Sequence, residues 1–126
     1  MTAASQQIVV KLRTELVAQL GRVGRRVNLP EGAIASLCVS EALLHPDDAK
    51  KKLTDGRANT REWGGPWLDV IATFEHPTGS YLRSFAAEVG FPVDLAAAKL
   101  VQLMVTRQPA TMIAKMRKSG TLPIDS

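Results

Sequence analysis

Residues 6–27 read QQIVVKLRTELVAQLGRVGRRV, and apolar side chains recur in this stretch at steps of three or four residues. These side chains are Val9, Leu12, Leu16, Leu20, Val23 and Val27. Such steps match the period of a helix and not the two-residue alternation of a strand. The stretch therefore predicts one amphipathic helix, with Lys11 and three arginines on the side opposite the apolar stripe.

Two glycines interrupt this predicted helix and leave a second interpretation open. Gly21 and Gly24 would each cost about 1 kcal/mol in a helix interior relative to alanine. If the helix ends at Leu20 instead, residues 21–26 form a basic loop. The sequence does not decide between helix and loop here.

The remainder of the chain also predicts helices. Residues 28–31 are typical of a helix start, with Asn28 as the capping residue. His45-Pro46 ends that helix, because a residue that precedes proline leaves the helical region. Further helices are expected from Pro46, from Pro66 to His76, from about Thr78 to Gly90, from Asp94 to about Arg107 and from Pro109 to Gly120. We find no strand and no internal repeat, so the prediction is an all-α fold, a compact single-domain bundle of six to seven short helices over residues 1–126.

Size and composition fit one globular domain. The chain has 126 residues, of which 45% are hydrophobic and 22% are charged. No apolar run approaches the roughly 18 residues that a membrane span needs, and the first residues lack the pattern of a signal peptide. Cys38 is the only cysteine, which excludes an intrachain disulfide. We therefore expect a cytoplasmic protein.

Residues that enzymes and metal sites use are scarce. The two histidines, His45 and His76, each precede a proline at a predicted helix end, and no spacing places two metal ligands on one helix face. The chain contains neither a glycine-rich phosphate-binding loop nor a nucleophile motif. We expect no enzyme, no metal, no cofactor, no membrane and no small-molecule substrate.

Positive charge gathers at both ends of the chain. Residues 1–29 carry five positive side chains and one negative, residues 30–76 carry five and eight, and residues 77–126 carry six and three. Phosphate backbones attract such clusters without any contact to a base. The predicted function is non-enzymatic binding of a nucleic-acid backbone without strong sequence preference, as a small subunit or accessory of a nucleoprotein assembly. The candidate binding residues are Lys11, Arg22, Arg25, Arg26, Lys115, Arg117 and Lys118.

One aromatic residue adds to this set. Trp63 lies beside Arg61 in the irregular stretch 55–66, where its ring could stack on a base or anchor a partner. Packing of Trp63 against the core is an equally good interpretation.

Two other functions stay open. One is a protein-binding adaptor or inhibitor that acts through the basic helix faces. The other is a helix-turn-helix-like regulator built on residues 86–100, although the second helix of that stretch has the composition of a core helix and not of a base reader. One continuous positive groove would favour nucleic acid, and separated patches would favour a protein partner. The sequence does not distinguish DNA from RNA.

Overall fold

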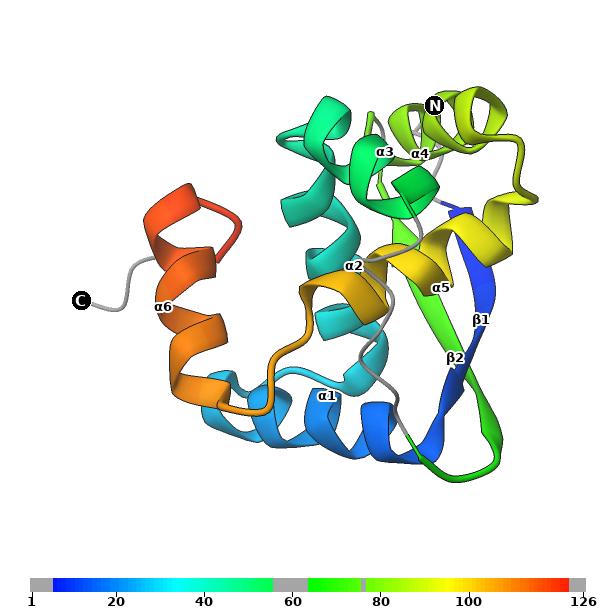
Figure 1. Ribbon diagram of the computed structural model, residues 1–126. Helices are drawn as coiled ribbons and strands as arrows, with labels where there is room; N and C mark the ends of the chain where they lie inside the picture. The colour runs from blue at the N-terminus through cyan, green and yellow to red at the C-terminus, as the bar shows by residue number, and fades with distance from the viewer. Residues whose placement is uncertain (1–5, 56–63, 76, 123–126) are drawn as a thin grey trace, which may run out of the picture.

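The computed structural model describes residues 6–55, 64–75 and 77–122 (Figure 1). Over these residues the chain forms six helices and a two-stranded antiparallel sheet. The fold is therefore mixed, mostly helical with a small sheet, and the prediction of an all-α bundle is wrong. The elements are β1 (Gln6–Arg13), α1 (Thr14–Val27), α2 (Glu31–Leu43), α3 (Pro46–Asp55), β2 (Trp67–Phe74), α4 (Thr78–Val89), α5 (Val93–Met104) and α6 (Pro109–Ser119).

The two strands replace parts of two predicted helices. β1 takes the first residues of the predicted helix 6–27, and β2 takes the predicted helix that begins at Pro66. In β1 the side chains of Val10 and Leu12 are buried, whereas Val9 is 47% exposed although helical spacing placed it inward. In β2 the side chains of Val70, Ala72 and Phe74 alternate inward. This two-residue period is the signature of a strand with one buried face.

Residues 21–26 belong to the helix α1 and do not form a basic loop. The helix runs through both glycines to Val27 and ends at Asn28, which adopts a left-handed conformation with φ of 61°. Asn28 thus ends this helix and does not begin the next one. Gly24 is required because a Cβ there would lie 2.2 Å from the carbonyl oxygen of Leu29, where the chain folds back over the helix end.

The other predicted helices are confirmed with small shifts in their bounds. The helix α2 ends before His45-Pro46, and α3 begins at Pro46 with two acidic residues in its first turn. Gly90 and Gly120 follow α4 and α6 in the left-handed conformation, as expected of helix stops. The helix α5 ends at Met104, three residues before the predicted Arg107.

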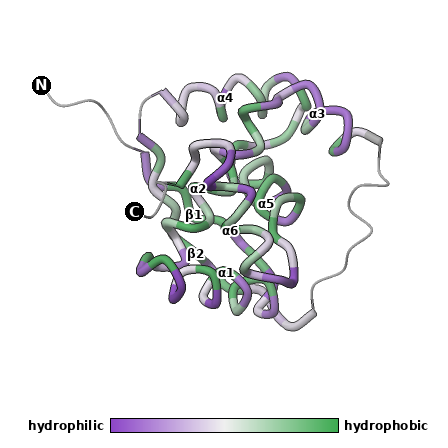
Figure 2. The backbone as a smooth tube through the Cα atoms, turned by 90° about the vertical axis from the view of Figure 1, so that its left-hand side faces the viewer, coloured by the Kyte–Doolittle hydropathy of each residue, from purple (hydrophilic) through white to green (hydrophobic). Residues whose placement is uncertain are grey.

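The helices α2 and α5 cross at the centre of the molecule and pack on the inner face of the sheet (Figures 1 and 2). Among the described residues, the polar or charged side chains buried in the interior are Gln19 and Glu41. Glu41 accepts hydrogen bonds from the hydroxyls of Ser119 and Thr121, which fastens the end of α6 to α2. No described helix is long and apolar enough to cross a membrane.

The architecture repeats within the chain. Each half has the order strand and three helices, and equivalent residues lie 62 positions apart through the first two helices. At this spacing the helix stop Asn28 corresponds to Gly90, and the buried Leu20 corresponds to Leu82. Few other residues are identical at the same spacing, which explains why the sequence shows no repeat.

The two halves exchange their packing partners. The helix α2 packs against β2 and α5 packs against β1, while α3 packs against α4 and α6 against α1. The strands keep the same spacing in their inward side chains, because the buried Val10 and Leu12 correspond to the buried Ala72 and Phe74. Val9 therefore corresponds to Ile71, and these two residues pair with each other in the sheet. An approximate two-fold axis therefore passes through the Val9–Ile71 pair.

Candidate nucleic-acid interface

The outer face of the two-stranded sheet, which we call the ribbon face, is exposed from end to end. Its central side chains form three cross-strand pairs, which are Gln7 with Thr73, Val9 with Ile71 and Lys11 with Asp69. All six residues are exposed, because alternation along each strand directs them away from the core. The face combines polar, charged and apolar side chains in one row of pairs.

One end of the ribbon face carries an aromatic residue covered by a cation. Arg13 and Trp67 are a cross-strand pair, and the guanidinium carbon of Arg13 lies 4.1 Å from the centroid of the Trp67 ring. Nη1 of Arg13 also donates a hydrogen bond of 2.9 Å to the carbonyl oxygen of Gly65. The Trp67 side chain remains 58% exposed. The helical spacing of Trp67 with Ile71 and Phe74 predicts that Trp67 lies in the core, and that prediction is wrong, because this segment is a strand and Trp67 lies on its outer face.

The turn of residues 64–66 is held against the junction of β1 and α1. The backbone N–H of Gly64 donates a hydrogen bond of 2.9 Å to Oε2 of Glu15, and the N–H of Thr14 donates one of 2.9 Å to the carbonyl oxygen of Pro66. Gly65 is required here, because its φ is +90° and a Cβ would lie 1.7 Å from Oγ1 of Thr14. Glu15 also forms an ion pair with Arg107.

These contacts make the contribution of Glu15 to the stability of the fold depend on pH. The hydrogen bond from Arg107, followed by that from the N–H of Gly64, lowers the pKa of Glu15 below its usual value of 4.5. A lowered carboxyl pKa contributes stability that is present above the unfolded pKa and is lost as the pH falls through the folded pKa. We expect Glu15→Gln to destabilise the fold at pH 7 and to have less effect below about pH 4.5. Urea denaturation of both proteins from pH 3 to pH 7 measures this, and a pH-independent difference would contradict it.

The arginines of α1 lie on the exposed side of that helix, as predicted. Arg22, Arg25 and Arg26 are all exposed, and Arg22 donates a hydrogen bond to the buried Gln19 of the preceding turn. Arg25 and Arg26 lie in the last turn, where the helix dipole alone favours cations by about 0.3–1 kcal/mol. Their position is thus explained both by a binding role and by helix stability.

The basic residues of α6 do not form one cluster. Lys115 and Lys118 lie on one flank of the buried stripe of α6, and Arg117 lies on the other flank. Figure 1 shows α6 at the opposite side of the molecule from the sheet, and α1 runs from the end of β1 toward α6. Lys11, which is exposed on the ribbon face, is therefore separated from the basic residues of α6. Arg61 and Trp63 lie outside the described residues.

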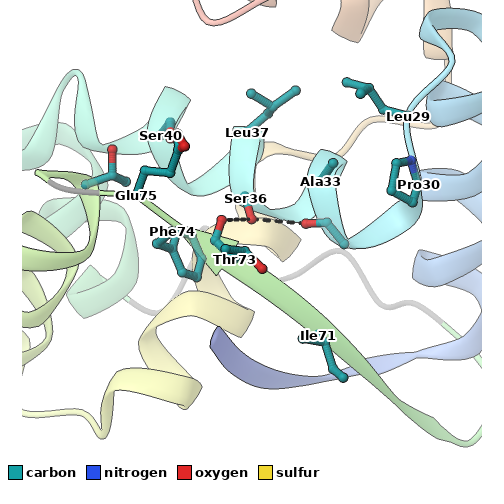
Figure 3. A pocket seen from close by; sticks show the side chains of 12 residues that line it. Leu29, Pro30, Ala33, Ser36, Leu37, Ser40, Ile71, Thr73, Phe74 and Glu75 are labelled. Carbon is teal, nitrogen blue, oxygen red and sulfur yellow. Dashed lines mark hydrogen bonds between the residues drawn. The ribbon is translucent and has the colours of Figure 1, made fainter. Parts of the chain in front are cut away.

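A groove of about 620 Å³ runs beside the ribbon, between α2 and the outer edge of β2 (Figure 3). Oγ of Ser36 bridges the two elements, since it lies 3.0 Å from the carbonyl oxygen of Gly32 and 2.8 Å from that of Thr73. Gly32 permits the close approach, because a Cβ there would lie 2.1 Å from the carbonyl oxygen of Ile71. The helix thus covers the hydrogen-bonding edge of β2 and leaves its outward side chains exposed.

The second helix of the helix-turn-helix interpretation is α5, and one face of this helix is buried in the core. Ala96, Ala97, Leu100 and Val101 of α5 are buried, and the helix packs against α2, α4 and β1. A helix held in this way would have to leave the core to place these residues in a DNA groove. The geometry therefore gives no support to α5 as a base-reading helix.

The single cysteine of the chain lies in the core. Cys38 is fully buried, and burial followed by the charge of Glu41 raises the pKa of its thiol. A protonated thiol in the core is a poor nucleophile. Within residues 6–55, 64–75 and 77–122, no three histidine, cysteine or acidic side chains gather as metal ligands would.

Sequence reasoning found Lys11 but missed the rest of the ribbon face. Gln7, Val9, Asp69, Ile71 and Thr73 belong to segments that were predicted as helices, so their shared exposure was hidden. The signal that could have found them is the β-branched content of Ile8-Val9-Val10 and of Val70-Ile71, which is typical of strands. Comparisons with protein-family models, with curated protein sequences and with solved structures found no match to this chain.

Proposed function

We propose that the protein binds double-stranded DNA and that the ribbon face enters the major groove. The observation that carries this proposal is a two-stranded antiparallel ribbon with four outward side chains on each strand, of which the central three pairs are exposed. The major groove of B-DNA is about 12 Å wide and admits a two-stranded ribbon. Strands about 4.8 Å apart, with their side chains, match that width.

The outward side chains have the chemistry that base edges require. Lysine donates to guanine, glutamine pairs with adenine, and aspartate accepts from the amino group of cytosine. Lys11, Gln7 and Asp69 supply these three groups, and Thr73 can pair with either kind of base. Val9 and Ile71, at the centre, suit contact with the methyl group of thymine.

The same geometry favours DNA over double-stranded RNA. An A-form RNA helix has a deep and narrow major groove that side chains cannot read. A ribbon backed by α2 and α5 on its inner face cannot narrow to enter it. We therefore expect weak binding of an RNA duplex of the same sequence.

In this proposal the basic residues of α1 act on the DNA backbone. Arg22, Arg25 and Arg26 lie away from the ribbon face, so they contribute long-range attraction and contacts to flanking phosphates, without reading bases. This part of the binding free energy tolerates any sequence and weakens with salt.

Replacing Lys11 tests the proposal. We expect Lys11→Ala to weaken binding of a labelled mixed-sequence DNA duplex and to reduce the preference for duplexes with G·C pairs, because this lysine is assigned to a guanine edge. Fluorescence anisotropy between ~50 and 200 mM salt measures both quantities. Lys51→Ala is the matched control, because it removes one exposed lysine from α3, which packs against α2 and α4, and should change neither. If the wild-type protein binds no duplex at ~50 mM salt, the proposal is wrong.

A protein partner is the second candidate for the same face. Val9, Ile71 and Trp67 are 47%, 58% and 58% exposed, and exposed apolar side chains in one patch often mark protein interfaces. The basic residues of α6 are separated from Lys11 and do not form one continuous positive groove with it, and separated patches favour a protein partner. The Lys11→Ala experiment distinguishes the two, because a protein-binding ribbon would leave DNA binding unaffected by that change.

A further inference from the structure

We infer that the target of the ribbon face is an asymmetric DNA site, with two unlike half-sites read by one chain in a single orientation. This inference rests on the proposed function and adds to it the class of sequence that is bound. It follows from the approximate two-fold axis through the Val9–Ile71 pair, together with the side chains that this axis relates.

The axis relates chemically different residues at the two ends of the ribbon face. Gln7 of β1 corresponds to Asp69 of β2, and Lys11 corresponds to Thr73. One end of the face therefore presents the neutral pair of Gln7 and Thr73. The other end presents the charged pair of Lys11 and Asp69, beside Arg13 and Trp67.

These two ends select different bases. Lysine and aspartate together match a G·C pair, because lysine donates to guanine while aspartate accepts from cytosine. Glutamine favours an A·T pair, and the apolar centre favours thymine methyl groups. The expected site has G·C at the Lys11–Asp69 end and A·T at the centre and at the Gln7–Thr73 end.

The covalent connection of both strands makes this asymmetry possible. When two identical chains form a ribbon, both ends carry the same residues, so the bound site is an inverted repeat. Here both strands belong to one chain and have diverged in sequence. A single chain can then bind a site that lacks two-fold symmetry, and the unlike ends define its direction on the DNA.

Selection from a random DNA duplex library with the 126-residue chain tests the inference. We expect the enriched sequence to lack an inverted repeat and to carry G·C pairs at one end only. Replacing that G·C end with A·T should weaken binding about 5- to 150-fold, the usual effect of one wrong base pair. An inverted repeat enriched by the wild-type chain would overturn the inference and leave the proposed function intact, whereas failure to enrich any duplex would overturn the proposed function.

A variant with a symmetric ribbon face adds a second readout. The double substitution Asp69→Gln/Thr73→Lys gives both ends the same pair of side-chain types and should convert the selected sequence into an inverted repeat. The control is Asp47→Gln/Thr111→Lys, which makes the same two changes at exposed positions on α3 and α6 and should retain the wild-type sequence. Circular dichroism establishes that each variant is folded. An asymmetric sequence selected by the folded symmetric variant would also overturn the inference.

Discussion

Gly32→Ala is expected to destabilise the fold by about 3 kcal/mol, the upper part of the range for overpacking a close contact. The added Cβ would lie 2.1 Å from the carbonyl oxygen of Ile71, which is backbone and cannot rotate away. Relief of the clash would move α2 off β2 and break the 2.8 Å contact between Ser36 and the carbonyl oxygen of Thr73. The midpoint of urea denaturation, compared with that of the wild type, measures the loss.

Gly21→Ala is the matched control for this prediction. Gly21 also lies inside a helix, but the nearest atom to its added Cβ is 3.5 Å away, which is ordinary contact. Alanine is preferred to glycine in a helix by about 1 kcal/mol, so this change should stabilise the protein slightly. Equal stability of the two variants would show that α2 does not approach β2 as closely as described.

Leu16→Ala is expected to cost about 2–5 kcal/mol, as large-to-small changes at fully buried leucines do. Leu16 is 2% exposed in the first turn of α1. The free energy of unfolding from equilibrium denaturation gives the value. A change of only a few tenths would mean that α1 does not belong to the core.

Val9→Ala completes this test, because helical spacing places Val9 and Leu16 on the same buried stripe. In the sheet Val9 faces outward and contacts its cross-strand neighbour, a pair worth about 0.2–1 kcal/mol. A loss below about 1 kcal/mol is therefore expected. A loss as large as that of Leu16→Ala would restore the helix prediction for residues 6–13.

The sequence was sufficient to predict the helices with strong local signals. Pro46 and Pro109 begin α3 and α6, and Gly90 ends α4 in the left-handed conformation. Proline and glycine restrict or permit backbone angles regardless of tertiary context, so these boundaries follow from local chemistry.

The strands were missed because their outer face is partly apolar, which outweighed the β-branched content of both segments. Trp67, Val70, Ile71 and Phe74 have helical spacing, yet only Val70 and Phe74 point inward. In β1, Val9 is apolar and exposed, so the apolar residues of this strand also follow helical spacing. A strand with one polar face would have shown clear alternation, so Val9 and Ile71, two of the side chains that we assign to binding, are those that obscured the fold.

The candidate site could be predicted only where charge marks it. Lys11 and the arginines of α1 were identified from charge and proved exposed. Gln7, Asp69 and Thr73 carry no distinctive motif, and they come together only because β1 pairs with a strand about sixty residues away. Register between distant strands depends on tertiary packing, which a single sequence does not reveal.

The exchange of packing partners between the halves has a consequence for how the chain folds. The helix α2 completes its packing on β2, and α5 completes its packing on β1, so neither half can bury its apolar face by itself. Pairing of β1 with β2 closes a loop of some sixty residues, and contact of α5 with β1 closes a longer one, so the entropic cost slows folding relative to a bundle of local contacts. Unfolding should therefore proceed as one cooperative transition, with both halves losing structure at the same denaturant concentration.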